Sequence, residues 1–346
     1  MAGLAKKPIL QVLGGEALPT PPVWLMRQAG RYLPEYRELR ARAKNFLDFC
    51  YTPSLATEVT LQPIRRYGFD GAILFADILL ILDAMGLDVQ FITGTGPVVE
   101  QVENADKLRQ IPHATVTERL SPVYETVRRV RASLPDETTL IGFAGSPWTV
   151  GLYAIEGRGG TDKSLARGMA QSDPERMADI LEAIGDATVG YLTAQVEAGA
   201  EVLMLFDSWA EGLADDVFRE IIIAPTRRLV TQLRTAGVDV PIIGFPRGAG
   251  PMVVEYVRET GVNALGLDTS ASPDFINASL PADLPVQGHL DPLLLVNGGD
   301  RMDARIRAIR EAYAGRPHIF NLGHGITPNV PPENVARLLS VLRETA

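Results

Sequence analysis

Eight short apolar runs, each followed by a helical pattern, constrain the fold of this chain more than any other feature of its sequence. The runs are continuously apolar rather than alternating, which is typical of parallel strands covered on both faces. They occupy residues 22–26, 71–75, 140–144, 202–206, 241–245, 264–268, 285–289 and 318–322. Eight strands that alternate with helices predict an α/β fold of the (β/α)8 TIM-barrel type.

Helical patterns with recognisable start signals separate the runs. Asp173 and Pro174 begin a long helix through Ala198, with aspartate as the cap and proline at the first helical position. The other predicted helices span roughly 53–67, 116–133, 213–236, 250–260, 302–314 and a last one from Pro332. Residues 87–100 predict a small hairpin excursion inside one connection, with the turn at Gly94-Thr95-Gly96-Pro97.

No linker or low-complexity stretch divides the chain, so we expect a single domain over residues 1–346. A doubly wound sheet is the competing fold. Such sheets usually contain five to seven strands and a glycine-rich first turn. The sequence contains no GxGxxG pattern, which favours the barrel.

Composition excludes several classes of function. The net charge of −9 argues against a nucleic-acid surface and means that an anionic ligand needs a local basic pocket. The single cysteine, Cys50, fits a reducing compartment, and we expect a cytoplasmic protein. None of the four histidines lies in an HExxH or CxxC pattern, so we expect no metal site. The longest apolar segment, 72–87, is interrupted by Asp77 and Asp83, so we expect no membrane span.

Polar side chains follow every predicted strand, where the active site of a barrel forms. The first run is followed by Arg27, Gln28, Ala29, Gly30 and Arg31, and later runs by Asp77, Tyr153, Ser208, Arg247, Asp268, Thr269, His289, Asp291 and His324. Arginine suits carboxylate or phosphate recognition because its planar fork bonds bidentately. Asp77 would then accept hydrogen bonds from the centre of a ligand whose rim carries carboxylates.

Structural interpretations of the same residues remain open at this stage. Arg27 and Arg31 could be a salt-bridged surface pair, and Asp77 could cap the helix that follows it. Tyr153 could be a core tyrosine, and Ser208 could be a helix cap. His324, between two glycines at the end of the last run, is the histidine that points most clearly to a site, although a lone histidine is a weak signal.

Several blocks in the chain resemble the uroporphyrinogen decarboxylase family over nearly its whole length. The two long ones are PVWLMRQAGRYLPEYRELR and GFAGSPWTVGLYAIEG, and the shorter ones are FADIL, FDSWAEG, GFPRGAG, GLDT, LDP and NLGHGI. Two positions differ from the usual family pattern. His289 stands where the family often has asparagine, and Thr269 follows GLD where tryptophan is common.

The resemblance implies a (β/α)8 barrel, commonly a homodimer, with no metal or organic cofactor. It implies removal of CO2 from the four acetate side chains of uroporphyrinogen III, which gives coproporphyrinogen III. Its substrate-binding residues correspond here to Arg27, Gln28, Ala29, Gly30, Arg31, Asp77, Tyr153, Ser208 and His324. Asp77 and Arg27 are the expected catalytic residues, and Arg40 lies in the same block as the arginine pair.

These residue types fit that reaction. A protonated pyrrole ring can take up the electrons released with CO2, so no separate cofactor is needed, and a fixed carboxylate such as Asp77 would stabilise the developing cation. The proton donor is open between Arg27, whose guanidinium is a weak acid, and His324. Two alternatives are a zinc-dependent methyltransferase on the same barrel, disfavoured by the single cysteine, and a tetrapyrrole carrier without turnover.

Overall fold

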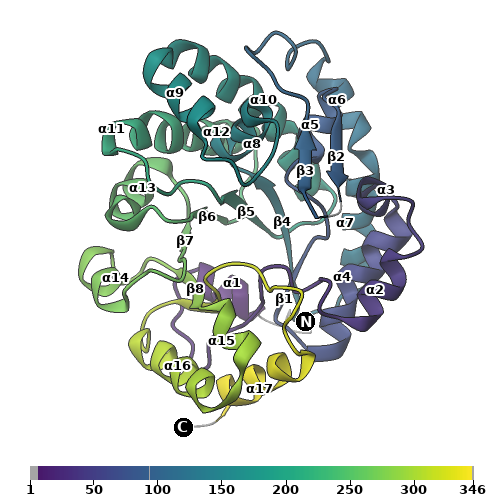
Figure 1. Cartoon of the computed structure of the whole chain (residues 1–346). Helices are drawn as coiled ribbons and strands as arrows, with labels where there is room; N and C mark the ends of the chain where they lie inside the picture. The colour runs from purple at the N-terminus through teal and green to yellow at the C-terminus, as the bar shows by residue number, and fades with distance from the viewer. Residues whose placement is uncertain (1–6, 93, 345–346) are drawn as a thin grey trace.

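A curled parallel sheet forms the centre of the computed structural model, which describes residues 7–92 and 94–344 (Figure 1). Its seven strands lie in the order β1-β4-β5-β6-β7-β8-β9, and each pairs with its neighbours in parallel. They span Gly71–Ile73, Thr139–Gly145, Val202–Asp207, Ile242–Pro246, Ala264–Gly266, Val286–Leu290 and His318–Leu322. Helices surround the sheet in Figure 1, so the predicted barrel architecture is confirmed.

The first predicted strand, 22–26, is the exception. It forms no regular strand and makes a single parallel bridge, between Val23 and Phe320 of β9. On its other side the Asp70 N–H donates to the Val23 carbonyl at 2.9 Å, just before β1 begins. The segment therefore closes the barrel between β9 and β1, but its pairing is too short for a ladder. Pro22 lacks an N–H donor, and the Val23 N–H bonds to the Asp70 carboxylate at 2.8 Å instead of a strand.

Most helices lie where the sequence predicts them, but two of the predicted helices are each divided into shorter ones. α4 spans Pro53–Tyr67 as predicted, and α10 spans Pro174–Glu197, with the Asp173 carboxylate accepting from the Arg176 N–H at 3.2 Å. The predicted helix 116–133 is two helices, α6 and α7, that meet at Leu120. The predicted helix 213–236 is likewise divided, because a π-helical turn at Arg219–Ile223 separates α11 from α12.

The remaining bounds complete the outer layer. They are α1 Pro8–Leu13, α2 Pro34–Arg40, α3 Phe46–Tyr51, α5 Leu80–Ala84, α6 His113–Arg119, α7 Ser121–Ser133, α8 Pro147–Glu156, α9 Ser164–Ser172, α11 Asp215–Phe218, α12 Ala224–Thr235, α13 Val253–Thr260, α14 Pro273–Ser279, α15 Pro292–Asn297, α16 Gly299–Ala312 and α17 Pro332–Leu342. None of the helices within residues 7–92 and 94–344 is long and apolar enough to cross a membrane.

The predicted hairpin is present beside the barrel. β2 (Val89–Ile92) and β3 (Gly96–Val99) pair antiparallel. The Val99 N–H donates to the Gly157 carbonyl at 2.7 Å, and Val98 bridges Arg158. The hairpin is thus attached to the end of α8, next to a loop that reaches the mouth of the barrel.

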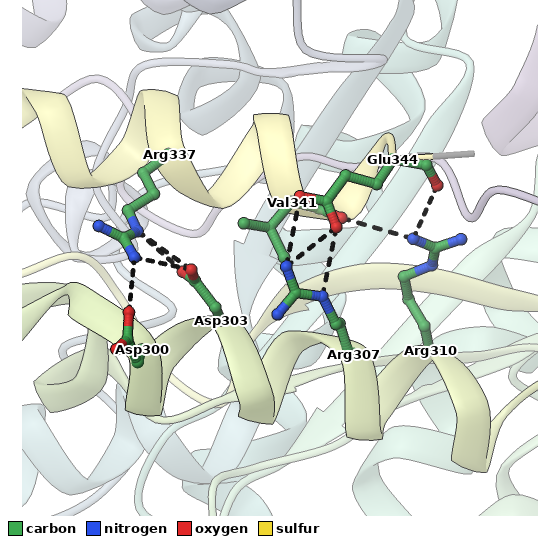
Figure 2. A network of polar contacts seen from close by, with 7 residues as sticks. All are labelled: Asp300, Asp303, Arg307, Arg310, Arg337, Val341 and Glu344. Carbon is green, nitrogen blue, oxygen red and sulfur yellow. Dashed lines mark hydrogen bonds and ion pairs between the residues drawn. The ribbon is translucent and has the colours of Figure 1, made fainter. Parts of the chain in front are cut away.

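An ion-pair network attaches the last helix to the outer layer (Figure 2). Arg337 of α17 contacts Asp303 at 2.8 Å and Asp300 at 3.2 Å, both on α16, and Arg307 contacts Glu344 at 3.0 Å. α17 also packs against α4 near the other end of the chain. This pairing joins the end of the ring of helices to its beginning.

Candidate active site

Arg27 lies where the segment 22–26 turns away from the barrel wall. Its φ of +62° is a left-handed conformation that a non-glycine residue rarely adopts, and such strain clusters at functional sites. The turn is tight: a Cβ at Gly30 would lie 2.8 Å from the Arg27 carbonyl oxygen. The Arg27 side chain crosses Gly325, where a Cβ would lie 2.7 Å from its Cγ and 2.9 Å from its Nε. The RQAGR and LGHGI motifs therefore build one feature together.

The other residues of the arginine run divide between wall and surface. Gln28 is fully buried, and its amide accepts from the Leu25 N–H and donates to the Gly71 carbonyl, both at 3.0 Å. Its side chain thus fastens the Arg27 turn to β1 rather than reaching into the mouth. Ala29 and Gly30 are half-buried in the turn, and Arg31 is exposed.

The two following arginines have structural partners. Arg37 donates to the Arg31 carbonyl at 2.8 Å and so closes the turn. The Arg40 guanidinium lies 5.7 Å from the centre of the Phe49 ring and donates to the Ala43 carbonyl at 3.3 Å. Arg27 and Arg31 therefore remain the members of this block that are open to a ligand.

Asp77 follows β1 and shares an electrostatic environment with Arg27. Its Oδ1 accepts from the Leu79 N–H at 2.9 Å, which closes the turn before α5 but is not a helix cap, because α5 begins at Leu80. Burial raises the pKa of Asp77, while the Leu79 N–H and the Arg27 guanidinium act in the opposite direction. The carboxylate is thus partly desolvated and within the field of a cation, which suits a group that must stabilise positive charge.

Tyr153 lies on α8 within the field of both groups. Burial raises the pKa of its hydroxyl, the Asp77 charge raises it further, and the Arg27 charge lowers it. Its ring meets Trp209 edge-on at a centroid distance of 6.3 Å, and Gly159 leaves room for it, since a Cβ there would lie 3.1 Å from Tyr153 Cε1. The half-buried tyrosine is therefore not a core residue but part of the wall of the mouth.

His324 is neutral in this environment. Burial lowers the pKa of its imidazole to about 4, and the Arg27 and Arg247 guanidinium groups contribute in the same direction. Its Nδ1 is buried and has no hydrogen-bond partner among the described residues. His324 can thus offer a neutral ring with a free nitrogen to a ligand.

Ser208 begins a loop that is held in place by side chains of α8. No helix of the described chain starts there, since α11 begins at Asp215, so the helix-cap interpretation is wrong. The preceding residue, Asp207, accepts from the Thr149 hydroxyl at 2.6 Å, and the Trp148 indole donates to the Trp209 carbonyl at 2.9 Å. These contacts with α8 hold the loop at the end of β5.

The two positions that depart from the family pattern lie in different places. His289 is buried and packs against the Tyr313 ring at a centroid distance of 5.9 Å, toward α16. The expectation that it contributes to the rim is therefore wrong. Thr269 is exposed, and its backbone crosses Gly323, where a Cβ would lie 2.6 Å from Thr269 Cα.

Sequence reasoning did not include Trp209, Lys163 and Glu211 in the site. Lys163 Nζ lies 4.2 Å from the centre of the Trp209 ring and 2.5 Å from Glu211 Oε1. The only sequence signal was the FDSWAEG block, because Lys163 reaches the loop from a distant part of the chain. No group of three or more potential metal ligands occurs in the part of the chain that the structure describes.

The chain is similar to known proteins over nearly its whole length. The chain matches the family model described as "Uroporphyrinogen decarboxylase (URO-D)" over residues 4–345. It is 66% identical over 343 residues to a protein of Hyphomonas neptunium named uroporphyrinogen decarboxylase, with 99% of each chain covered. It is 55% identical to a protein of the same name from Maricaulis maris, again with 99% of each covered.

A solved structure supports the fold alone. A methyltransferase from Methanosarcina mazei superposes with a TM-score of 0.81, at 19% identity and with 97% of each chain covered. That identity is too low to transfer its chemistry, whereas the full-length matches above are specific. The chain belongs to the uroporphyrinogen decarboxylase family.

Proposed function

We propose that this chain removes CO2 from the four acetate side chains of uroporphyrinogen III and so produces coproporphyrinogen III, with Asp77 and Arg27 as its catalytic residues. The observation that carries the site assignment is the crossing of Arg27 over Gly325. Asp77, Tyr153 and His324, from three other parts of the chain, all lie within the electrostatic field of the Arg27 guanidinium.

Binding uses two kinds of contact. Arg27 and Arg31 bind carboxylates at the rim of the macrocycle by charge-assisted hydrogen bonds, each worth about 1.5–3 kcal/mol. The Asp77 carboxylate accepts hydrogen bonds from the pyrrole N–H groups at the centre. Its Oδ1 is already bonded to Leu79, which fixes the orientation of the carboxylate before the ligand arrives. Tyr153, Ser208 and His324 complete the wall around the ring.

The chemistry proceeds within the bound pyrrole. Protonation of a ring carbon next to the acetate creates a cation, which the Asp77 carboxylate stabilises. The bond between the acetate methylene and its carboxylate then breaks, CO2 leaves, and the bonding electron pair flows into the ring. A proton added to the exocyclic carbon, with loss of the proton from the ring carbon, leaves a methyl group. The pyrrole ring itself is the electron sink, so the proposed reaction includes no cofactor.

The low pKa of His324 bears on the choice of proton donor. In the ligand-free chain, the low pKa of the imidazole favours a role as a neutral hydrogen-bond partner of a carboxylate. We propose Arg27 as the group that positions the acetate and, because its side chain is exposed, as a donor that acts through a water molecule. We also propose that the chain acts as a cytoplasmic homodimer built from a single domain over residues 1–346. The family resemblance and the single buried cysteine support this.

The test is product analysis. The purified chain is incubated anaerobically with uroporphyrinogen III, and porphyrins are separated by chromatography alongside a measurement of CO2 release. The wild type should give coproporphyrinogen, and Asp77→Asn should keep the shape of the site but lose turnover by about 100-fold or more. Near-normal turnover in Asp77→Asn would refute the role of Asp77. Tight binding without any CO2 release by the wild type would favour the carrier alternative.

A further inference from the structure

A cluster of cations surrounds Glu211 in the loop after β5, and none of them is among the predicted substrate-binding residues. Lys163 Nζ donates to Glu211 Oε1 at 2.5 Å, and Arg247 Nη1 lies 3.4 Å from Glu211 Oε2. Arg167 Nη2 donates to the Glu211 backbone carbonyl at 2.6 Å. Two cations thus contact the Glu211 carboxylate and a third contacts its backbone, so basic side chains gather locally in a chain whose net charge is −9.

Arg247 is the cation that keeps free donors. Its side chain is 36% exposed, and within the described residues it donates through Nη1 alone, to the Ser208 carbonyl at 3.2 Å and to Glu211. The neighbouring Asp268 is already occupied, because it accepts from the Gly248 N–H at 2.6 Å and from the Ser270 N–H at 2.7 Å. The edge of the Arg247 guanidinium formed by Nε and Nη2 remains open, and this edge binds a carboxylate bidentately.

Lys163 has the opposite character. Its side chain is 10% exposed and is enclosed between Glu211 and the Trp209 ring. Because Lys163 makes the short ion pair with Glu211, the longer contact at 3.4 Å neutralises Arg247 weakly. Gly248, with a φ of +78°, packs directly on Glu211, where a Cβ would lie 3.1 Å from Glu211 Cα. Lys163 and Glu211 therefore hold Arg247 in place.

Arg247 belongs to the same mouth as Arg27. It follows β6, and it bonds to Ser208, which lies at the end of the neighbouring strand β5. The guanidinium groups of Arg27 and Arg247 both act on His324, at the end of β9. Arg27 follows the segment 22–26 and Arg247 follows β6, so the two arginines come from separate parts of the barrel wall. A flat macrocycle with carboxylates around its rim requires cations on more than one side.

We propose that Arg247 is a further substrate-binding residue, which binds a peripheral carboxylate of the macrocycle beside Ser208 at the ends of β5 and β6, with Lys163 and Glu211 as positioning residues. The inference rests on the proposed function, because it takes the polycarboxylate macrocycle as the ligand. Arg247→Gln removes the charge and the fork, so KM for uroporphyrinogen should rise on the order of ten-fold or more. The turnover number should change much less, since Arg247 does not touch the reacting carbon.

The experiment compares KM and kcat for the wild type, Arg247→Gln, Arg247→Lys and Arg307→Gln, with thermal unfolding as a check on folding. Arg247→Lys keeps the charge but not the fork, so it should recover part of the affinity. Arg307, on α16 and paired with Glu344 (Figure 2), is the matched control and should leave both constants unchanged. An active wild type with an unchanged KM in both Arg247 variants overturns this inference alone. A wild type that releases no CO2 overturns the proposed function instead.

Discussion

Replacement of Gly325 by alanine tests whether the crossing of two motifs sets the position of Arg27. The φ of Gly325 is not in the left-handed region, so alanine meets no backbone penalty, and the added methyl acts by contact alone. That methyl would lie 2.7 Å from Arg27 Cγ and 2.9 Å from Arg27 Nε. An ordinary carbon–carbon contact needs about 3.5–4.0 Å, so the stem of Arg27 must move by roughly 1 Å.

The expected loss of activity follows from the hydrogen bond between Arg27 and a substrate carboxylate that such a shift would break. Loss of one charge-assisted hydrogen bond to a substrate carboxylate costs about 1.5–3 kcal/mol, which corresponds to a fall in kcat/KM of roughly 10- to 150-fold. The assay is the initial rate of CO2 release from uroporphyrinogen under anaerobic conditions, over a range of substrate concentrations. Gly168→Ala is the matched control, because nothing lies within 4 Å of the added Cβ. It should leave activity unchanged and stabilise α9 by up to about 1 kcal/mol.

A double-mutant cycle decides whether the effect acts through Arg27. In an Arg27→Ala background the stem that Gly325 accommodates is gone, so Gly325→Ala should cost less than about 0.5 kcal/mol further. Additive losses from Arg27→Ala and Gly325→Ala would refute the reasoning. They would mean that the glycine serves some other contact and that the two motifs do not form one feature.

Three further predictions concern charge. Burial raises the pKa of Asp207 to about 7, so ionisation of Asp207 destabilises the folded state increasingly as pH rises from about 4 to 7. Between pH 5 and 8 the free energy of unfolding should fall by about 2–3 kcal/mol for this reason, and urea unfolding of Asp207→Asn should lack that loss. The same pH dependence in Asp207→Asn and the wild type would contradict this prediction. Burial also raises the pKa of Asp77, so Asp77→Asn should unfold at an equal or higher temperature than the wild type above pH 7 despite its lost turnover; a clear drop in Tm would indicate a structural role instead. Burial lowers the pKa of His324 to about 4, so His324→Gln should raise KM without altering the shape of the pH profile of kcat/KM between pH 6 and 8. Loss of a rising or falling part of that profile in the variant would instead assign proton transfer to His324.

Sequence patterns predicted the parts of the fold that depend on local composition. The apolar runs that became β4, β5, β6, β8 and β9 are buried along their whole length or nearly so, and their continuous hydrophobicity is visible without a structure. The start of α10 was equally clear, because an aspartate cap and a first-turn proline act within a few residues. The glycine-rich hairpin was predicted for the same reason.

Tertiary structure decided how distant segments meet. The segment 22–26 has the composition of a strand, but it joins the barrel through one bridge and a carboxylate from Asp70, which no local pattern reveals. Gln28 follows the first apolar run, where a ligand-binding residue is expected, but its side chain bonds to the backbone of Leu25 and Gly71 in the barrel wall. His289 lies at a strand end and faces α16.

The same division holds for the site. The residue types could be read from the sequence, because arginines, an aspartate and a histidine at strand ends favour an anionic ligand, and the family blocks indicated which one. The sequence did not predict the electrostatic state of these residues. The neutral His324, the desolvated Asp77 and the open edge of Arg247 arise from burial and from charges that lie far apart along the chain. Desolvation and Coulomb interactions depend on distance in space, and only the folded chain sets those distances.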